Sequence, residues 1–91
     1  MTIEELYQII CERRDHPSQA SYTSRLMEAG EDEILKKIGE EAMEVILAGK
    51  GQGDSRVVEE VADLTYHALV FLAYRHISPQ DVTAELERRH K

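Results

Sequence analysis

The sequence holds one cysteine, two prolines and no tryptophan in 91 residues. Because Cys11 has no second cysteine to pair with, a disulfide within the chain is excluded as a support for the fold. A chain this short removes only about 60 to 70% of its surface from water on folding. A chain of this size therefore needs additional stabilisation, and with a disulfide excluded it can come from a metal ion or a partner subunit. We expect Cys11, which lies within an apolar pattern, to be buried rather than reactive.

Long hydrophobic runs and an excess of positive charge are also missing. No apolar stretch reaches the length of a membrane span or forms a signal peptide, so we expect a cytoplasmic protein. Eleven Lys and Arg against eighteen Asp and Glu give a net charge of −7. This charge argues against a nucleic-acid backbone or an anionic membrane as partner. With 42% hydrophobic residues, the composition predicts a globular domain.

Hydrophobic residues recur at helical spacing, and no segment alternates at period two for long enough to predict a strand. We therefore expect a single all-α domain over residues 1–91, similar to a four-helix bundle with one short extra helical turn. Caps and helix breakers set the ends of the helices. The expected helices are one capped by Thr2 and ending near Asp15, a short one capped by Thr23 and closed by Gly30, one over about 31–48 stopped by Gly49, one capped by Asp54 or Ser55 and reaching about His76, and one begun by Ser78 and Pro79 that runs towards Arg89.

The fourth of these helices has an unusual second half. Residues 68–74 are apolar on every side, which predicts burial all round rather than against a single neighbour. One small bundle supplies too little surface for that. A homodimer that packs this helix against its symmetry mate would provide it, and would also give a short chain the support it needs. We therefore predict a homodimer.

Two pairs of acidic residues lie beside the apolar stripes of the two long helices. Glu41 and Glu44 form one i, i+3 pair, and Glu60 and Asp63 form the other. The short turn between the helices makes them antiparallel neighbours, so the four carboxylates can converge. Converging carboxylates lose hydration and repel one another unless a cation neutralises them. Oxygen ligands suit Mg²⁺, so the spacing predicts a magnesium site.

Three other polar side chains lie near these pairs. On a helical wheel Lys37 shares the ridge of Glu41, whereas Glu40 points outward. His67 shares a face with Glu60, where it either hydrogen-bonds a ligand carboxylate or is a satisfied core histidine. The glycines at 49, 51 and 53 predict a flexible turn, because they lack the spacing of a phosphate-binding loop.

Three motifs carry a family resemblance: K-I-G-E-E-A-M-E-V at residues 37–45, E-E-V-A-D-L-T-Y-H at residues 59–67, and S-Y-T at residues 21–23. Together, over nearly the whole chain, they closely resemble the phosphoribosyl-ATP pyrophosphatases of histidine biosynthesis. More distantly, they are similar to the MazG-like all-α nucleoside triphosphate pyrophosphohydrolases. In some organisms this activity is fused to the cyclohydrolase that follows it, and 91 residues leave no room for that second domain.

The resemblance implies Mg²⁺-dependent hydrolysis of phosphoribosyl-ATP between its α- and β-phosphates by a homodimer. It also implies roles for particular residues. The Mg²⁺ ligands would be Glu41, Glu44, Glu60 and Asp63. Lys37 would bind a phosphate, and Glu40 is a candidate general base. The candidate substrate-binding residues are Arg13, Ser21, Tyr22, Lys37 and His67.

Two other functions stay open. A pyrophosphatase that removes deoxynucleotides or damaged nucleotides would share the carboxylates but not the S-Y-T motif. A helical interaction module would use the acidic ridge only to remain soluble. Turnover that needs a metal ion separates both enzymes from the module, and the identity of the nucleotide consumed separates the enzymes from each other.

Overall fold

The computed structural model describes residues 1–90, which form five helices and no strand. These are α1 (Ile3–Asp15), α2 (Tyr22–Ala29), α3 (Glu31–Gly49), α4 (Asp54–Tyr74) and α5 (Pro79–Arg89). The predicted all-α class is therefore confirmed. No helix within residues 1–90 combines the length and apolar character needed to cross a bilayer.

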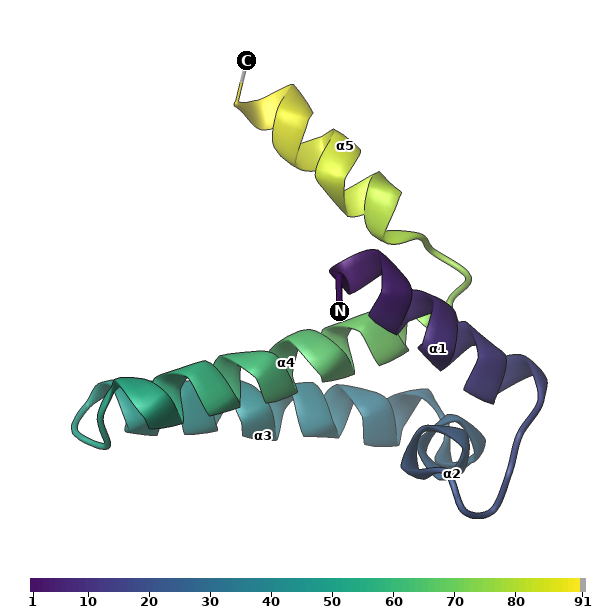
Figure 1. The fold of residues 1–91 in the computed structure, drawn as a ribbon, viewed down its shortest axis with the longest axis horizontal. Helices are drawn as coiled ribbons and strands as arrows, with labels where there is room; N and C mark the ends of the chain where they lie inside the picture. Colours follow the sequence, from purple (N-terminus) through teal and green to yellow (C-terminus); the bar gives the residue numbers. More distant parts are fainter. Residues whose placement is uncertain (91) are drawn as a thin grey trace.

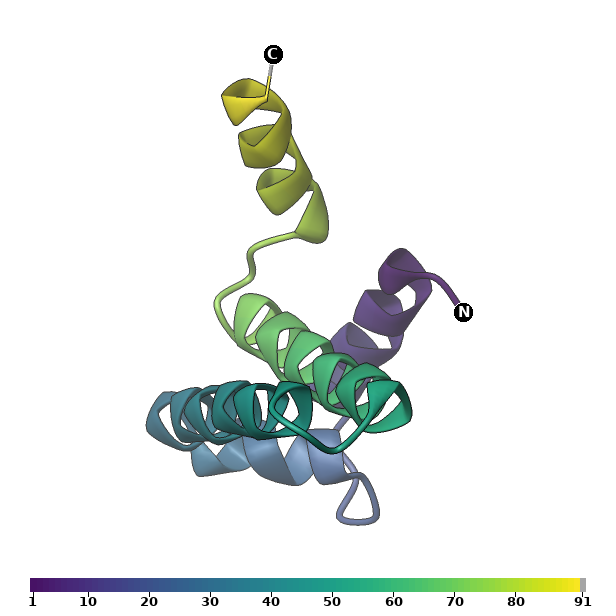
Figure 2. The ribbon, with the colours of Figure 1, turned by 90° about the vertical axis from the view of Figure 1, so that its left-hand side faces the viewer.

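The two longest helices are the centre of the molecule. α3 and α4 run antiparallel, side by side, and α1 crosses the C-terminal half of α4 (Figure 1). α2 lies against the start of α3. A view from the turn between α3 and α4 shows α5 standing away from this body (Figure 2). The last helix therefore leaves the bundle instead of completing it.

Side-chain caps fix the ends of α1 and α5 as expected. Glu5 N donates to Thr2 Oγ1 at 3.0 Å, and Thr2 N donates back to Glu5 Oε1 at 2.7 Å. Ser78 and Asp81 form the same reciprocal capping box at the start of α5. Such boxes satisfy two backbone N–H groups that the first helical turn leaves without partners.

Two predicted N-caps are wrong. Ser21 caps α2, because its Oγ accepts from Ser24 N at 3.1 Å, whereas Thr23 lies buried inside the helix. Neither Asp54 nor Ser55 caps α4, since Gly53 holds that position with a φ of 88°. A positive φ is open to glycine at little cost, so the chain reverses at Gly53 and Asp54 becomes the first helical residue.

The hydrophobic core lies where α1, α2 and the start of α3 meet the second half of α4. Cys11 is half-buried against this core, in agreement with a structural role. Within residues 68–74 of the single chain, some side chains are buried, others are half-buried, and Tyr74 is exposed. The buried core residues are Tyr7, Ile10, Leu26, Ile34, Leu69, Val70 and Ala73.

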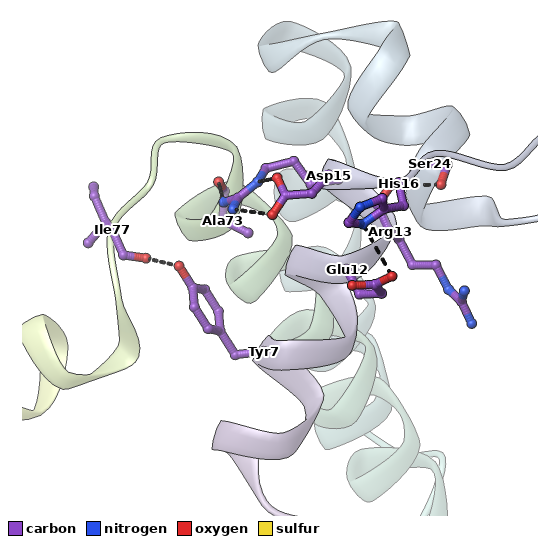
Figure 3. A network of polar contacts seen from close by, with 9 residues as sticks. Tyr7, Glu12, Arg13, Asp15, His16, Ser24, Ala73 and Ile77 are labelled. Carbon is purple, nitrogen blue, oxygen red and sulfur yellow. Dashed lines mark hydrogen bonds and ion pairs between the residues drawn. The ribbon is translucent and has the colours of Figure 1, made fainter.

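Hydrogen bonds from α1 hold the connection between α4 and α5. Tyr7 Oη donates to the Ile77 carbonyl at 2.6 Å (Figure 3), and Arg14 Nη1 donates to the Ala73 carbonyl at 2.7 Å. α4 ends at Tyr74, before the predicted His76, because His76 turns the backbone left-handed at a φ of 58°. Burial raises the pKa of Tyr7, so its hydroxyl remains a donor at neutral pH.

Removing the Tyr7 hydroxyl tests this attachment. We expect Tyr7→Phe to lower the free energy of unfolding by about 1 kcal/mol, because the Ile77 carbonyl loses its donor. In a domain of this size that is a fall of about 4–8 °C in Tm. Tyr74→Phe is the matched control, since no hydrogen bond to the Tyr74 hydroxyl is found within residues 1–90. Equal Tm values for the two variants in thermal melts would contradict the prediction.

Candidate metal centre

α3 and α4 bring three of the four predicted ligand carboxylates together. Glu41, Glu60 and Asp63 each offer one oxygen, and these oxygens all lie within 4.8 Å of one another. Glu60 is only 6% exposed, Glu41 is half-buried and Asp63 is open to solvent. We call these three residues the carboxylate cluster. The carboxylate cluster is buried on the side of Glu60 and open to solvent on the side of Asp63, so an ion can enter from solvent.

The fourth predicted ligand, Glu44, lies outside the carboxylate cluster. It is half-buried on α3, three residues after Glu41. A rise of about 1.5 Å per residue displaces it by roughly 4.5 Å along the helix axis. Within the described part of the chain, the carboxylate cluster is the one group of three His, Cys, Asp or Glu that meets metal-binding spacing.

The pKa of Glu41 reflects both its burial and the charges of the other two carboxylates in the carboxylate cluster. Burial raises the pKa of Glu41 above its ordinary value, and the nearby charges of Asp63 and Glu60 raise it further. The charged form of Glu41 is therefore disfavoured in the folded protein. A divalent cation would reverse this effect, because an opposite charge favours the ionised form.

Sequence reasoning missed a cation that contacts the carboxylate cluster. Arg56 Nη2 donates to Glu60 Oε1 at 2.6 Å, and Arg56 Nη1 pairs with Glu59. Arg56 and Glu60 are four residues apart on α4, so the i, i+4 spacing was the signal that could have revealed the pair.

Lys37 and Glu40 form an ion pair on α3, with Lys37 Nζ 3.5 Å from Glu40 Oε1. Glu40 is exposed, as its outward wheel position predicts. Glu40 raises the pKa of Lys37, and Tyr22 raises it further.

His67 is a hydrogen-bonded core histidine that links α2 to the carboxylate cluster. Its Nδ1 lies 2.8 Å from the Asp63 carbonyl, which can only accept, so Nδ1 carries the proton. In the neutral ring Nε2 then accepts from Tyr22 Oη at 3.1 Å. His67 is 7% exposed and contacts the backbone of Asp63. The structure thus favours the core histidine over a histidine bound to a ligand carboxylate.

The S-Y-T motif is attached to α4 at a second point. Thr23 Oγ1 hydrogen-bonds Tyr66 Oη, and burial raises the pKa of Tyr66. The rings of Tyr66 and His67 meet edge to face with centroids 4.9 Å apart. Tyr22, whose ring lies within 6.3 Å of both, completes this aromatic group.

Arg13 and Ser21, two predicted substrate-binding residues, share a pocket of about 320 Å³ at the start of α2. Ser18 and Ala20 complete its lining. Ser24 Oγ donates to the Arg13 carbonyl at 2.9 Å, which fixes the backbone, while the Arg13 side chain points away from the neighbouring Glu12–His16 pair (Figure 3). Across residues 1–90 no ion pair to the Arg13 guanidinium is found. The group is therefore available to an anion.

Comparison with known proteins agrees with the motifs. A family model described as phosphoribosyl-ATP pyrophosphohydrolase matches residues 3–90. The chain is 52% identical over 89 residues to the phosphoribosyl-ATP pyrophosphatase of Pelotomaculum thermopropionicum, covering 98% of this chain and 91% of that protein. It is 48% identical over 87 residues to the enzyme of the same name from Geotalea daltonii, covering 96% and 82%. It is also 44% identical over 90 residues to the histidine biosynthesis bifunctional protein HisIE of Nostoc, covering 99% of this chain and 42% of that protein.

The raised pKa of Glu41 predicts a stability gain when its charge is removed. In chelator-treated protein at neutral pH, we expect Glu41→Gln to raise Tm by a few degrees. The folded state holds the Glu41 proton more tightly than the unfolded state, so wild-type stability falls as pH rises above the ordinary value of 4.5. The gain should therefore shrink in melts at lower pH.

The control for this variant is Glu87→Gln, which removes the same charge from exposed α5. It should leave Tm close to the wild-type value at each pH. A Glu41→Gln protein no more stable than wild type at neutral pH would show that the carboxylate cluster is not under electrostatic strain.

Proposed function

The chain belongs to the phosphoribosyl-ATP pyrophosphohydrolase family, and we propose that its carboxylate cluster binds the Mg²⁺ with which it works. It is a hydrolase that converts phosphoribosyl-ATP to phosphoribosyl-AMP and pyrophosphate, the second step of histidine biosynthesis. The observation that carries the metal proposal is the convergence of the Glu41, Glu60 and Asp63 oxygens within 4.8 Å of one another.

The donor set of the carboxylate cluster fits Mg²⁺. All the donors are carboxylate oxygens, which Mg²⁺ prefers, and one face is open for water and substrate phosphates. A triphosphate is itself an anion, so it approaches three carboxylates only when cations lie between them. Glu44, one turn along α3, is our candidate for a fourth ligand.

When bound, Mg²⁺ supplies charge neutralisation at the phosphate oxygens and activation of water. The residues of the chain then bind and orient the substrate. Lys37 binds a phosphate oxygen, and Glu40 accepts the proton of the attacking water once substrate draws Lys37 away from it. Their ion pair supports this assignment, because it places a cation and a carboxylate side by side on α3, the helix that also carries Glu41.

The S-Y-T end of the molecule binds the remainder of the substrate. We assign the phosphoribosyl phosphate to Arg13 and Ser21, whose pocket offers a guanidinium and a hydroxyl to an anion. Tyr22 and His67 connect this end to Asp63 through two hydrogen bonds. In this assignment His67 acts by positioning Tyr22 and the backbone of Asp63.

The active form is a homodimer. α5 has no buried residue within the single chain, and its Val82 and Leu86 are 44% and 53% exposed. An apolar pocket of about 450 Å³ lies between α5 and the body, with Ile38 and Leu72 in its lining. A second copy of the chain, which presents the same apolar surface, is the partner that covers it.

Loss of one ligand tests the metal centre. We expect wild-type protein with Mg²⁺ to release pyrophosphate from phosphoribosyl-ATP, and Asp63→Asn to lower kcat/KM by about 100-fold or more. Asp54→Asn makes the same chemical change on the same helix, outside the carboxylate cluster, and should stay close to wild type. Equal kcat/KM for the two variants would contradict the metal centre. Consumption of a deoxynucleoside triphosphate instead of phosphoribosyl-ATP would overturn the substrate assignment.

A charge on α5 tests the dimer. We expect a mass of two chains in light scattering at micromolar concentration, and a shift towards one chain in Val82→Glu, because a charge in an apolar interface is costly. Ala84→Glu adds the same charge about 200° around the helix and should remain dimeric. A wild-type protein with the mass of one chain would exclude the dimer.

A further inference from the structure

Arg56 is the cation that contacts the carboxylate cluster most directly. Its Nη2 lies 2.6 Å from Glu60 Oε1, and its Nη1 pairs with Glu59 on the same helix. The Arg56 side chain is 44% exposed while that of Glu60 is 7% exposed. The guanidinium therefore reaches from the solvent side onto a buried carboxylate.

The charges around Glu60 require such a partner in the absence of a metal ion. A buried carboxylate that loses its only cation is strongly destabilising, and here two further carboxylates lie within 4.8 Å. Among the described residues, Arg56 is the one Lys or Arg that forms an ion pair with a member of the carboxylate cluster. Lys37, the next candidate, is paired with Glu40.

We propose that Arg56 is a built-in counter-ion that supports the metal-free fold and competes with the divalent cation for Glu60. The inference rests on the proposed metal centre. A cation bound to Glu60 lies a few ångströms from the guanidinium, where two positive charges repel. Metal binding therefore favours release of Glu60 by Arg56.

Glu59 gives Arg56 an alternative partner after release. It is exposed and already contacts Nη1, so the guanidinium can leave Glu60 with little movement and keep one ion pair. The cost of release is then small enough for the metal ion to overcome. Arg56 thus sets how tightly the centre binds its ion, rather than whether it binds.

The test compares Arg56→Gln with wild type in two measurements without substrate: Tm after chelation, and Mg²⁺ affinity by titration calorimetry. We expect a lower Tm without metal, Mg²⁺ binding tightened by about 3- to 10-fold, and a larger rise in Tm when Mg²⁺ is added. Glu59→Gln should weaken Mg²⁺ binding, because Arg56 then has no other partner. Arg88→Gln breaks the comparable Arg88–Glu85 pair on exposed α5 and should change neither quantity.

The possible outcomes separate the two proposals. Mg²⁺ binding to Arg56→Gln that is equal to or weaker than wild type overturns the counter-ion and leaves the metal centre standing. A wild-type protein that binds no Mg²⁺ overturns the proposed metal centre. The proposed competition between Arg56 and the ion then fails as well. Arg56→Lys keeps the charge and should lie between wild type and Arg56→Gln, so the series remains informative even if Arg56→Gln unfolds without metal.

Discussion

The repulsion among Glu41, Glu60 and Asp63 is the constraint on which the rest of the structure depends. Three carboxylates lie within 4.8 Å of one another and one of them is buried, so the fold holds charges that separate in the unfolded chain. Antiparallel packing of α3 and α4 keeps them together, because the short glycine turn fixes which faces meet. Burial of Glu41 raises its pKa, and the charges of Asp63 and Glu60 in this arrangement raise it further.

The S-Y-T motif has a structural explanation in the same terms. Ser21 begins α2, Tyr22 reaches His67, and Thr23 reaches Tyr66 on α4. These contacts tie an eight-residue helix, too short to be stable alone, to the helix that carries Glu60 and Asp63. A segment remote in sequence is thereby linked through His67 to the backbone of Asp63 in the carboxylate cluster.

Much of the fold and of the carboxylate cluster could be predicted from the sequence, and the features that were missed depend on information that local patterns do not carry. Local patterns gave the five helices and the convergence of Glu41 with residues of α4, because helix periodicity alone sets which side chains share a face. They did not give the Gly53 cap, which depends on backbone conformation at a turn. They also missed the departure of α5, since an amphipathic face does not identify its partner. Arg56 was missed for another reason. Its i, i+4 spacing to Glu60 is visible in the sequence, but such an ion pair matters for stability only when its acid is buried, and burial is known only from the structure.

The cost of the carboxylate cluster also bears on the supports that we propose for a chain of 91 residues without a disulfide, namely a metal ion and a partner subunit. A small core leaves little free energy to offset repulsion within a site. In our proposals each support acts on a different part of that cost: Arg56 lowers it before metal binds, Mg²⁺ would remove it once bound, and a partner subunit would enlarge the apolar area buried. The three proposed supports would not be interchangeable, because Arg56 would oppose the ion whereas a dimer interface built on the apolar side chains Val82 and Leu86 would not. If removal of Arg56 tightens Mg²⁺ binding as we propose, the stability of the metal-free protein then depends more on the proposed subunit interface.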